Sequence, residues 1–272
     1  MKIKNIFCVM DPTAETQHAL ARAAFVARAQ GAAITAYLVV PKDEDMADPE
    51  GWLETQLAPF REQGLTLETQ IEHNTDWRQA IATAAERSGA DLITKSTYRR
   101  PAVRRWLLRN SDHLLLKSAR CPILFSKTDS TLAERGPEKI LVAVNVNADD
   151  PERRELRETV TRYARELVEQ LGAEMHVVNA FPNRMEFVHP PDLAKTFGIA
   201  RNQAHVGEGA AEDMITETCE RLGNPLLIMG AVIRPGVKGM VVGNTAERIL
   251  NAVPGDVLAI VRPGFAKLPP QT

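Results

Sequence analysis

The sequence predicts an α/β protein built from two tandem, doubly wound parallel-sheet domains. Three observations predict it: the chain repeats itself once, each copy alternates short strands with helices, and most strands are apolar throughout. A strand that is apolar on both faces is typical of a parallel sheet that helices cover on both sides. A length of 272 residues accommodates two domains of ordinary size.

The repeat appears when the sequence is compared with itself. Ile6–Asp11 lies over Ile140–Asn145 at a shift of 134 residues, whereas Gly31 lies over Gly172 at a shift of 141. The second copy therefore gains seven residues near its first helix and loses seven before its third strand. Insertions between elements are expected of two copies of one fold, so we infer a domain duplication and not a short solenoid repeat.

Each copy predicts five strands in the same order. The first copy has them at Ile6–Met10, Ala33–Val40, Leu65–Ile71, Leu92–Thr94 and Ile123–Phe125, and the second at Ile140–Val144, Met175–Ala180, Ala204–Val206, Leu226–Met229 and Val257–Val261. Helical segments with short connections separate these strands. Right-handed crossovers between successive strands then give a parallel sheet with helices on both faces.

The first helix of the second copy has clear signals at both ends. Its apolar stripe consists of Leu156, Val160, Tyr163, Leu167 and Leu171. Asp150 before Pro151 predicts a capped start, and Gly172 predicts the end. The polar segment that contains Gly136 separates the copies. We therefore expect a first domain at residues 1–127, a linker at 128–138, a second domain at 139–263 and a tail at 264–272.

The composition excludes several classes of protein. Lys and Arg number 33 and Asp and Glu 35, for a net charge of −2, which gives no electrostatic footprint for nucleic-acid binding. The apolar run before Asp11 is too short for a signal peptide, and no run approaches the ~20 residues of a membrane span. We expect a cytoplasmic protein with no nucleic-acid partner and no membrane span.

No pattern in the sequence predicts catalysis or a metal site. Cys8, Cys121 and Cys219 have no metal-ligand spacing and are interpreted as reduced structural thiols. The histidines form no H-x3-H pair, and the chain lacks G-x-S-x-G, a phosphate-binding P-loop and a Cys/His dyad signature. His205 is either near a ligand crevice or bonded to the backbone, and His176 is interpreted as a core residue. We predict no catalytic residue and no metal.

The residues after the fourth strand of the second copy carry a resemblance. Gly230 and Gly243 are 13 residues apart, and Asn244 and Thr245 follow. This spacing resembles the universal stress protein family, most closely its tandem, E-type branch. The resemblance implies a Rossmann-like fold similar to adenine-nucleotide alpha hydrolases. Nucleotide-binding members carry G-x2-G-x9-G-[S/T] in this place and an Asp after the first strand.

This chain departs from the family pattern at two positions of the second copy. Ile233 stands where the second glycine is expected and Asn145 where the Asp is expected. A branched side chain at Ile233 is expected to narrow the phosphate channel, whereas Asn145 can still hydrogen-bond a ribose or a base edge. The candidate ligand-binding residues are Asn145, Gly230, Arg234, Gly236, Gly243, Asn244 and Thr245.

Each of these residues also has a structural interpretation. Gly230 and Gly243 suit either close approach to an anion or a tight turn and close helix–strand packing. Asn244 is a good helix cap, and Glu247 three residues on resembles a capping box.

The first copy is expected not to bind nucleotide in the family manner. Ser96, Arg99, Ala102 and Arg109 occupy the glycine positions. The same loop carries Arg100, Arg104 and Arg105 around Trp106. These arginines either recognise a phosphate or carboxylate, or form a solvated loop paired with acids.

Three functions stay open. The first is a non-catalytic stress-response protein that binds a small ligand, nucleotide-like or phosphorylated, or protein partners. The second is an ATP-binding protein with slow ATPase or autophosphorylation, so that ATP or a related nucleotide is the candidate cofactor. The third is a binder of a lipid-like or nucleotide-sugar metabolite in the crevice of the second domain, which the short segment 182–191 could enlarge.

The resemblance also bears on assembly. In the family, single domains pair through the strand at their C-terminal edge, here Ile123–Phe125 and Val257–Val261. Pairing these two strands within one chain would cover both exposed edges. We therefore predict a pseudo-twofold intrachain pair of domains, and leave a further homodimer open.

Overall fold

A computed structural model describes residues 2–41, 46–97, 111–127, 136–147, 150–236, 239–242 and 244–261. Residues up to 127 are called the N-terminal half, and residues from 136 onward the C-terminal half. The N-terminal half contains β1 (Asn5–Val9), α1 (His18–Gln30), β2 (Ala33–Val40), α2 (Pro49–Glu62), β3 (Leu67–His73), α3 (Trp77–Arg87), β4 (Leu92–Ser96), α4 (Ser111–Ser118) and β5 (Ile123–Ser126).

The C-terminal half repeats this order with additions. It contains β6 (Lys139–Val144), α5 (Pro151–Leu171), β7 (Glu174–Phe181), α6 (Pro190–Phe197), β8 (Ala204–Glu208), α7 (Ala211–Arg221), β9 (Leu226–Ala231), β10 (Ile233–Gly236), β11 (Gly239–Val242), α8 (Asn244–Ala252) and β12 (Val257–Val261). All ten predicted strands are present. The bounds of β2 and β12 are those that the sequence predicts.

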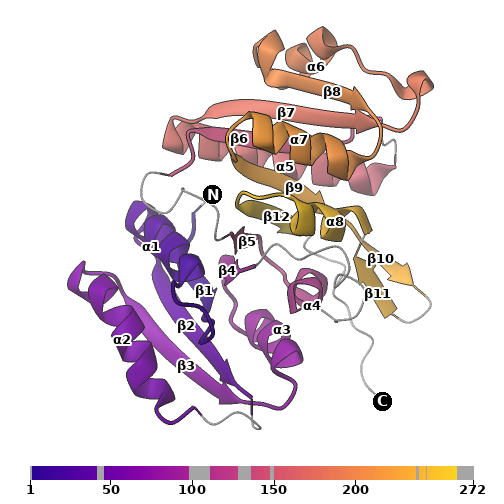
Figure 1. The fold of residues 1–272 in the computed structure, drawn as a ribbon. Coiled ribbons are helices and arrows are strands. Elements are labelled where there is room, and N and C mark those ends of the chain that lie inside the picture. Colours follow the sequence, from indigo (N-terminus) through magenta and orange to yellow (C-terminus); the bar gives the residue numbers. More distant parts are fainter. Residues whose placement is uncertain are drawn as a thin grey trace.

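These ten strands form one sheet in the order β3-β2-β1-β4-β5-β12-β9-β6-β7-β8. Within each half the neighbouring strands are parallel. The order in each half is that of a doubly wound sheet, with the first strand in the middle and the chain crossing in both directions from it. Figure 1 shows the two halves meeting along β5 and β12.

The strands β5 and β12 are antiparallel, with Leu124 opposite Leu258. These two leucines are counterparts at the 134-residue shift, and Ile123 pairs with Ala259 as Phe125 pairs with Val257. The register is therefore symmetric about the leucine pair, as a pseudo-twofold axis requires. The predicted intrachain pairing of the edge strands is present, and we call it the seam.

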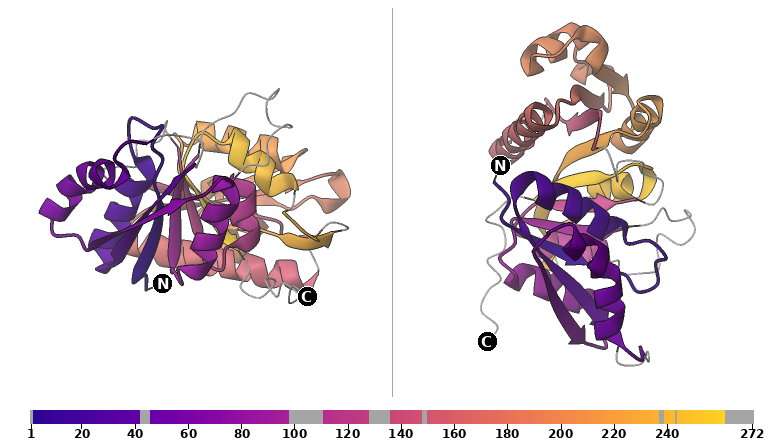
Figure 2. Two further views of the ribbon diagram at one scale, coloured as in Figure 1. Left: turned by 90° about the horizontal axis from the view of Figure 1, so that it is seen from below. Right: turned by 90° about the vertical axis from the view of Figure 1, so that its left-hand side faces the viewer.

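Each face of the sheet carries one hydrophobic core that continues across the seam. Helices α1, α2, α5 and α6 pack on one face, and α3, α4, α7 and α8 on the other. The two views in Figure 2 show these helix layers on either side of the sheet. Leu124 and Leu258 belong to the first core, and Phe125 and Val257 to the second. Both halves therefore share their apolar interior.

The ends of α5 follow the predicted signals. The Asp150 carboxylate accepts hydrogen bonds from the Glu152 and Arg153 amides at 3.0 and 3.1 Å. Gly172 ends the helix in the left-handed region, at a φ of 63°, where a side chain would be strained. The seven residues gained before this point account for most of the greater length of the helix, since α5 has 21 residues and α1 has 13.

The sequence analysis did not predict α6 or the hairpin of β10 and β11. The last two residues of the segment 182–191 belong to a helix, because α6 begins at Pro190. The glycine-rich residues after β9 form a two-stranded antiparallel sheet in which Gly236 pairs with Gly239. The sequence signal for this hairpin is weak, since Ile233–Gly236 contains a single β-branched residue and a proline.

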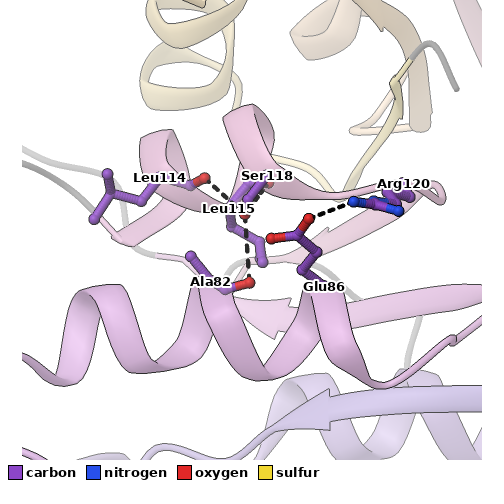
Figure 3. A network of polar contacts seen from close by, with 6 residues as sticks. All are labelled: Ala82, Glu86, Leu114, Leu115, Ser118 and Arg120. Carbon is purple, nitrogen blue, oxygen red and sulfur yellow. Dashed lines mark hydrogen bonds and ion pairs between the residues drawn. The ribbon is translucent and has the colours of Figure 1, made fainter. Parts of the chain in front are cut away.

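Polar contacts fix α4 against α3 in the N-terminal half. The Ser118 hydroxyl lies 3.5 Å from the Ala82 carbonyl of α3, and Arg120, just after α4, pairs with Glu86 of α3 at 2.6 Å. Figure 3 shows these contacts at the end of α4. These contacts hold the end of α4 against α3.

None of the helices within the described residues has the length and apolar character needed to cross a membrane.

Replacing Leu258 by Ala should destabilise both halves together. Leu258 is 5% exposed and lies in the seam, so the cavity is expected to cost about 2–5 kcal/mol. All three tryptophans (Trp52, Trp77 and Trp106) belong to the N-terminal half. Their fluorescence in a urea titration should therefore report a change made in the other half.

The control is Met185→Ala, because Met185 is 97% exposed in the same half as Leu258. An unchanged tryptophan midpoint in Leu258→Ala would show that the halves unfold independently.

Candidate ligand-binding site

A cavity of about 460 Å³ opens in the C-terminal half. It lies where β6 and β9 end, between α5 on one face of the sheet and α7 and α8 on the other. Its described lining is Ala143, Val144, Asn145, Arg153, Leu156, Arg157, Val160, Val178, Ala180, Ala211, Ile215, Met229, Gly230, Val232, Thr245, Ala246 and Ile249. The carboxyl ends of neighbouring strands are where open α/β sheets bind ligands, and this volume suits a small molecule.

Asn145 lies at the mouth of the cavity, directly after β6. Its Oδ1 accepts a hydrogen bond from the Asn147 amide at 3.1 Å, which fixes the turn. The counterpart Asp11 makes the same contact with the Thr13 amide at 3.0 Å. Because Oδ1 is engaged in the turn, Nδ2 is the group of Asn145 that can donate to a ligand.

Two arginines of α5 give the cavity a positive side. Arg157 Nη1 donates to the carbonyls of Asn145 and Val146, both at 3.1 Å, and so holds the end of β6 against the helix. Arg153 pairs with Asp150 at 3.1 Å. Both arginines line the cavity, and none of the described lining residues is acidic. The field inside therefore favours an anionic ligand.

Gly230 is a glycine because α5 packs closely against β9. A Cβ at this position would lie 2.7 Å from Leu156 Cγ and Cδ2. Leu156 itself lines the cavity, so a side chain at position 230 would push it into the open space. Close helix–strand packing, one of the two interpretations from the sequence, thus accounts for this glycine, while it also keeps the cavity wide.

The first turn of α8 forms another wall. Thr245 and Ala246 line the cavity, and the free amides of a helix start favour negative charge. Asn244 is the first residue of α8 and not the residue before it. Glu247 Oε2 lies 3.4 Å from His113 Nδ1 of α4. This contact joins the two halves, and the capping box stays a prediction.

The other candidate residues lie on the hairpin or beyond the described residues. Ile233, Arg234 and Gly236 belong to β10, and Arg234 pairs with Val241 in the ladder. Gly243 lies outside the described residues. The structure thus brings Asn145, Gly230 and Thr245 together around one cavity.

In the N-terminal half an ion pair occupies the corresponding crevice. Lys95, Ser96 and Asp112 are the counterparts of Met229, Gly230 and Ala246 at the 134-residue shift. Lys95 Nζ lies 2.7 Å from Asp112 Oδ1, and the Thr97 hydroxyl donates to Asp112 Oδ2 at 2.7 Å. The side chains of Lys95 and Asp112 are 13% and 3% exposed, so a buried ion pair stands where Met229 and Ala246 line the cavity of the other half.

Ser96 completes the filling of this crevice. Its hydroxyl accepts a hydrogen bond from the Ala19 amide at 3.2 Å. This bond gives an acceptor to one of the backbone amides in the first turn of α1. The arginine-rich loop (Arg99, Arg100, Arg104, Arg105 and Arg109) lies outside the described residues. The sequence analysis named Ser96 as the residue at the first glycine position, but it did not single out Lys95 or Asp112.

The thiols are poor nucleophiles. All three cysteines are free, and burial raises the pKa of Cys8, Cys121 and Cys219 to about 12. A thiol with such a pKa stays protonated at neutral pH and is unreactive. Among the described residues, no group of three or more His, Cys, Asp or Glu is placed to hold a metal ion.

Two histidines of the C-terminal half contact each other away from the cavity. His176 of β7 and His205 of β8 face each other at 3.0 Å between Nδ1 and Nε2. Arg221 Nη2 lies 3.1 Å from His205 Nδ1. Because Arg only donates, His205 Nδ1 accepts and its Nε2–H donates to His176. His205 is therefore bonded to side chains near the start of its strand, not near the ligand crevice.

A doubly wound sheet with a cavity at the carboxyl ends of its strands defines a small-molecule-binding α/β module, and this chain contains that fold twice. The model of the universal stress protein family matches residues 2–127 and 146–261. The chain therefore belongs to the universal stress protein family, as a tandem member.

Relatives of full length support this assignment. Universal stress protein E of Escherichia coli K12 is 26% identical over 94% of this chain and 93% of its own. Universal stress protein E of Photorhabdus laumondii is 24% identical over 96% of each chain. A functionally unknown protein from Pseudomonas aeruginosa PAO1 has a similar structure, with a TM-score of 0.76, 26% identity, and coverage of 96% of this chain and 93% of that one.

The histidine pair should make the protein less stable in mild acid. Burial, with the nearby Arg221, lowers the pKa of His205 from its ordinary 6.5 to about 4, and burial lowers that of His176. Unfolding restores the ordinary values, so the unfolded chain binds more protons in this range. The contribution of these two histidines to the free energy of unfolding is therefore complete above pH 6.5 and is lost as the pH falls toward 4.

Thermal unfolding measured at several pH values should show a falling midpoint across this window. His205→Gln should flatten the dependence, whereas His73→Gln, at an exposed position, should not. An equal pH dependence in His205→Gln and the unmodified protein would contradict the assignment.

Proposed function

We propose that this chain is a non-catalytic, cytoplasmic stress-response protein that binds one small anionic ligand in its C-terminal half. The ligand class is a nucleotide or another phosphorylated metabolite. The division into modules at 1–127 and 139–263 is part of this proposal. One observation carries it: Met229 and Ala246 line an open cavity in the C-terminal half, whereas their counterparts Lys95 and Asp112 form a buried ion pair in the N-terminal half.

The chemistry of the cavity supports an anion. Arg153 and Arg157 lie on one side of it and the start of α8 on another. Backbone amides at a helix start and guanidinium groups are the donors that bind phosphate and carboxylate. Asn145 Nδ2 adds a donor at the mouth, where it can reach a ribose or a base edge.

A second candidate is an amphipathic ligand, such as a lipid-like metabolite. Much of the described lining is aliphatic, including Val144, Leu156, Val160, Val178 and Ile215. Such walls favour an apolar body, with the arginines at its charged end. Nucleotide and amphiphile share the anionic group, and they differ in what fills the apolar part of the cavity.

Removing the Asn145 donor should weaken binding in the C-terminal half only. We expect Asn145→Ala to reduce affinity for the bound anion by about 3- to 10-fold, the effect of one lost hydrogen bond. Isothermal titration with ATP, AMP and decanoate measures it and separates the two ligand classes. The matched control is Asp11→Ala, which removes the equivalent side chain beside the filled crevice and should leave affinity unchanged.

If none of the three probes binds, or if Asp11→Ala weakens binding as much as Asn145→Ala, the proposed site is wrong.

Transferring the ion pair should close the cavity. In Met229→Lys/Ala246→Asp, the C-terminal half carries the residues that fill the other crevice, so binding of the same probe should disappear. Circular dichroism checks that the double variant folds. A folded double variant with unchanged affinity would place the ligand elsewhere.

A further inference from the structure

The surface that joins the two halves consists of counterpart residues. Helices α1 and α5 face each other across a second cavity, of about 100 Å³, beside the seam. At the 141-residue shift the residues that line it are counterparts: Arg22 and Tyr163, Phe25 and Glu166, Val26 and Leu167, Ala29 and Gln170, and Gln30 and Leu171. The pseudo-twofold axis therefore passes between these helices, yet the paired residues differ in charge and polarity.

A buried ion pair crosses the interface on one side of the axis. Arg22 Nε of α1 lies 2.5 Å from Asp256 Oδ2, directly before β12. Their side chains are 4% and 1% exposed. The other carboxylate oxygen, Oδ1, accepts a hydrogen bond from the Lys127 amide at 2.9 Å. The carboxylate of the C-terminal half is thus held by two groups of the N-terminal half.

The residues at the positions related by the pseudo-twofold axis do not form a second ion pair. The counterparts of Arg22 and Asp256 are Tyr163 and Pro122. In a pair of two C-terminal halves, Asp256 would face the uncharged phenol of Tyr163. In a pair of two N-terminal halves, Arg22 would face Pro122 and lose the carboxylate. Breaking a buried ion pair by removing one partner is strongly destabilising.

A second pair lies on the axis itself. His113 of α4 and Glu247 of α8 are counterparts at the 134-residue shift, and they contact each other at 3.4 Å. A residue on a twofold axis meets its own copy when two like surfaces pair. Two C-terminal halves would therefore bring two Glu247 carboxylates together, whereas the unlike halves bring a carboxylate to an imidazole. This contact lowers the pKa of Glu247.

We propose that the Arg22–Asp256 and His113–Glu247 pairs make this interface specific for unlike halves, so that each half fits the other half and not a second copy of itself. A buried ion pair contributes little more stability than apolar residues of the same size, but it penalises partners that lack the opposite charge. The specificity matters because two chains could otherwise pair N-terminal with N-terminal half and C-terminal with C-terminal half.

The pair on the axis gives a test with little risk to folding, because both side chains are partly exposed. His113→Glu reproduces the contact of two C-terminal halves, and Glu247→His that of two N-terminal halves. We expect His113→Glu to lower the folding equilibrium constant by about 3-fold in urea titrations. The inverted double variant His113→Glu/Glu247→His should recover to within about twofold of the unmodified protein. Additive losses in the double variant would overturn the proposal.

The buried pair gives the larger effect. Arg22→Met should lower the folding equilibrium constant by about 100-fold, because Asp256 then stays buried without its cation. Arg22→Met/Asp256→Asn should be at least about 10-fold more stable than the single variant. Glu54→Gln is the control, since its exposed ion pair with Arg61 lies within one half and should have little effect.

Tryptophan fluorescence and circular dichroism together show whether the interface is what fails. The first reports the N-terminal half alone and the second the whole chain. We expect their midpoints to coincide in the unmodified protein and to separate in Arg22→Met. Coincident midpoints in Arg22→Met, together with additive effects of the Arg22 and Asp256 substitutions, would show that the pair only stabilises the local fold and would overturn the proposal.

Discussion

The antiparallel pairing of β5 with β12 is the constraint on which the rest of the structure depends. It joins two parallel sheets into one, with Leu124 and Leu258 opposite each other at the centre. Both hydrophobic cores continue across it, so the two halves share part of their apolar interior. The pairing also covers two strand edges that would otherwise be free to associate with other chains. We therefore expect the unmodified chain to unfold as one unit.

Duplication allowed the two crevices to diverge while the sheet stayed the same. In the N-terminal half, Lys95 and Asp112 form an ion pair at the positions that line the cavity in the other half. The Ser96 hydroxyl accepts a hydrogen bond from the Ala19 amide at the start of α1. In the C-terminal half, Met229, Gly230 and Ala246 leave a cavity of about 460 Å³. In the proposed function, a few side chains at equivalent positions therefore decide which half binds a ligand, while both halves retain the seam that joins them.

Much of this arrangement follows from the sequence, because it depends on local periodicity. The apolar strands, the Asp150 cap and the Gly172 end were all predictable, and so were three residues around the cavity. The ion pair in the N-terminal crevice was not predictable, because Lys95 and Asp112 meet only after β4 and α4 pack together. The role of Gly230 likewise depends on how closely Leu156 approaches it. The hairpin was missed because its glycines were interpreted only as a ligand loop.

The number of ligands bound per chain tests the central claim most directly. Native mass spectrometry of the protein titrated with an anionic ligand that binds it counts them without further assumptions. One open crevice and one filled crevice predict saturation at one ligand per chain, with no second step at higher concentration. Saturation at two equivalent ligands per chain would contradict the account, because the N-terminal crevice would then also be open.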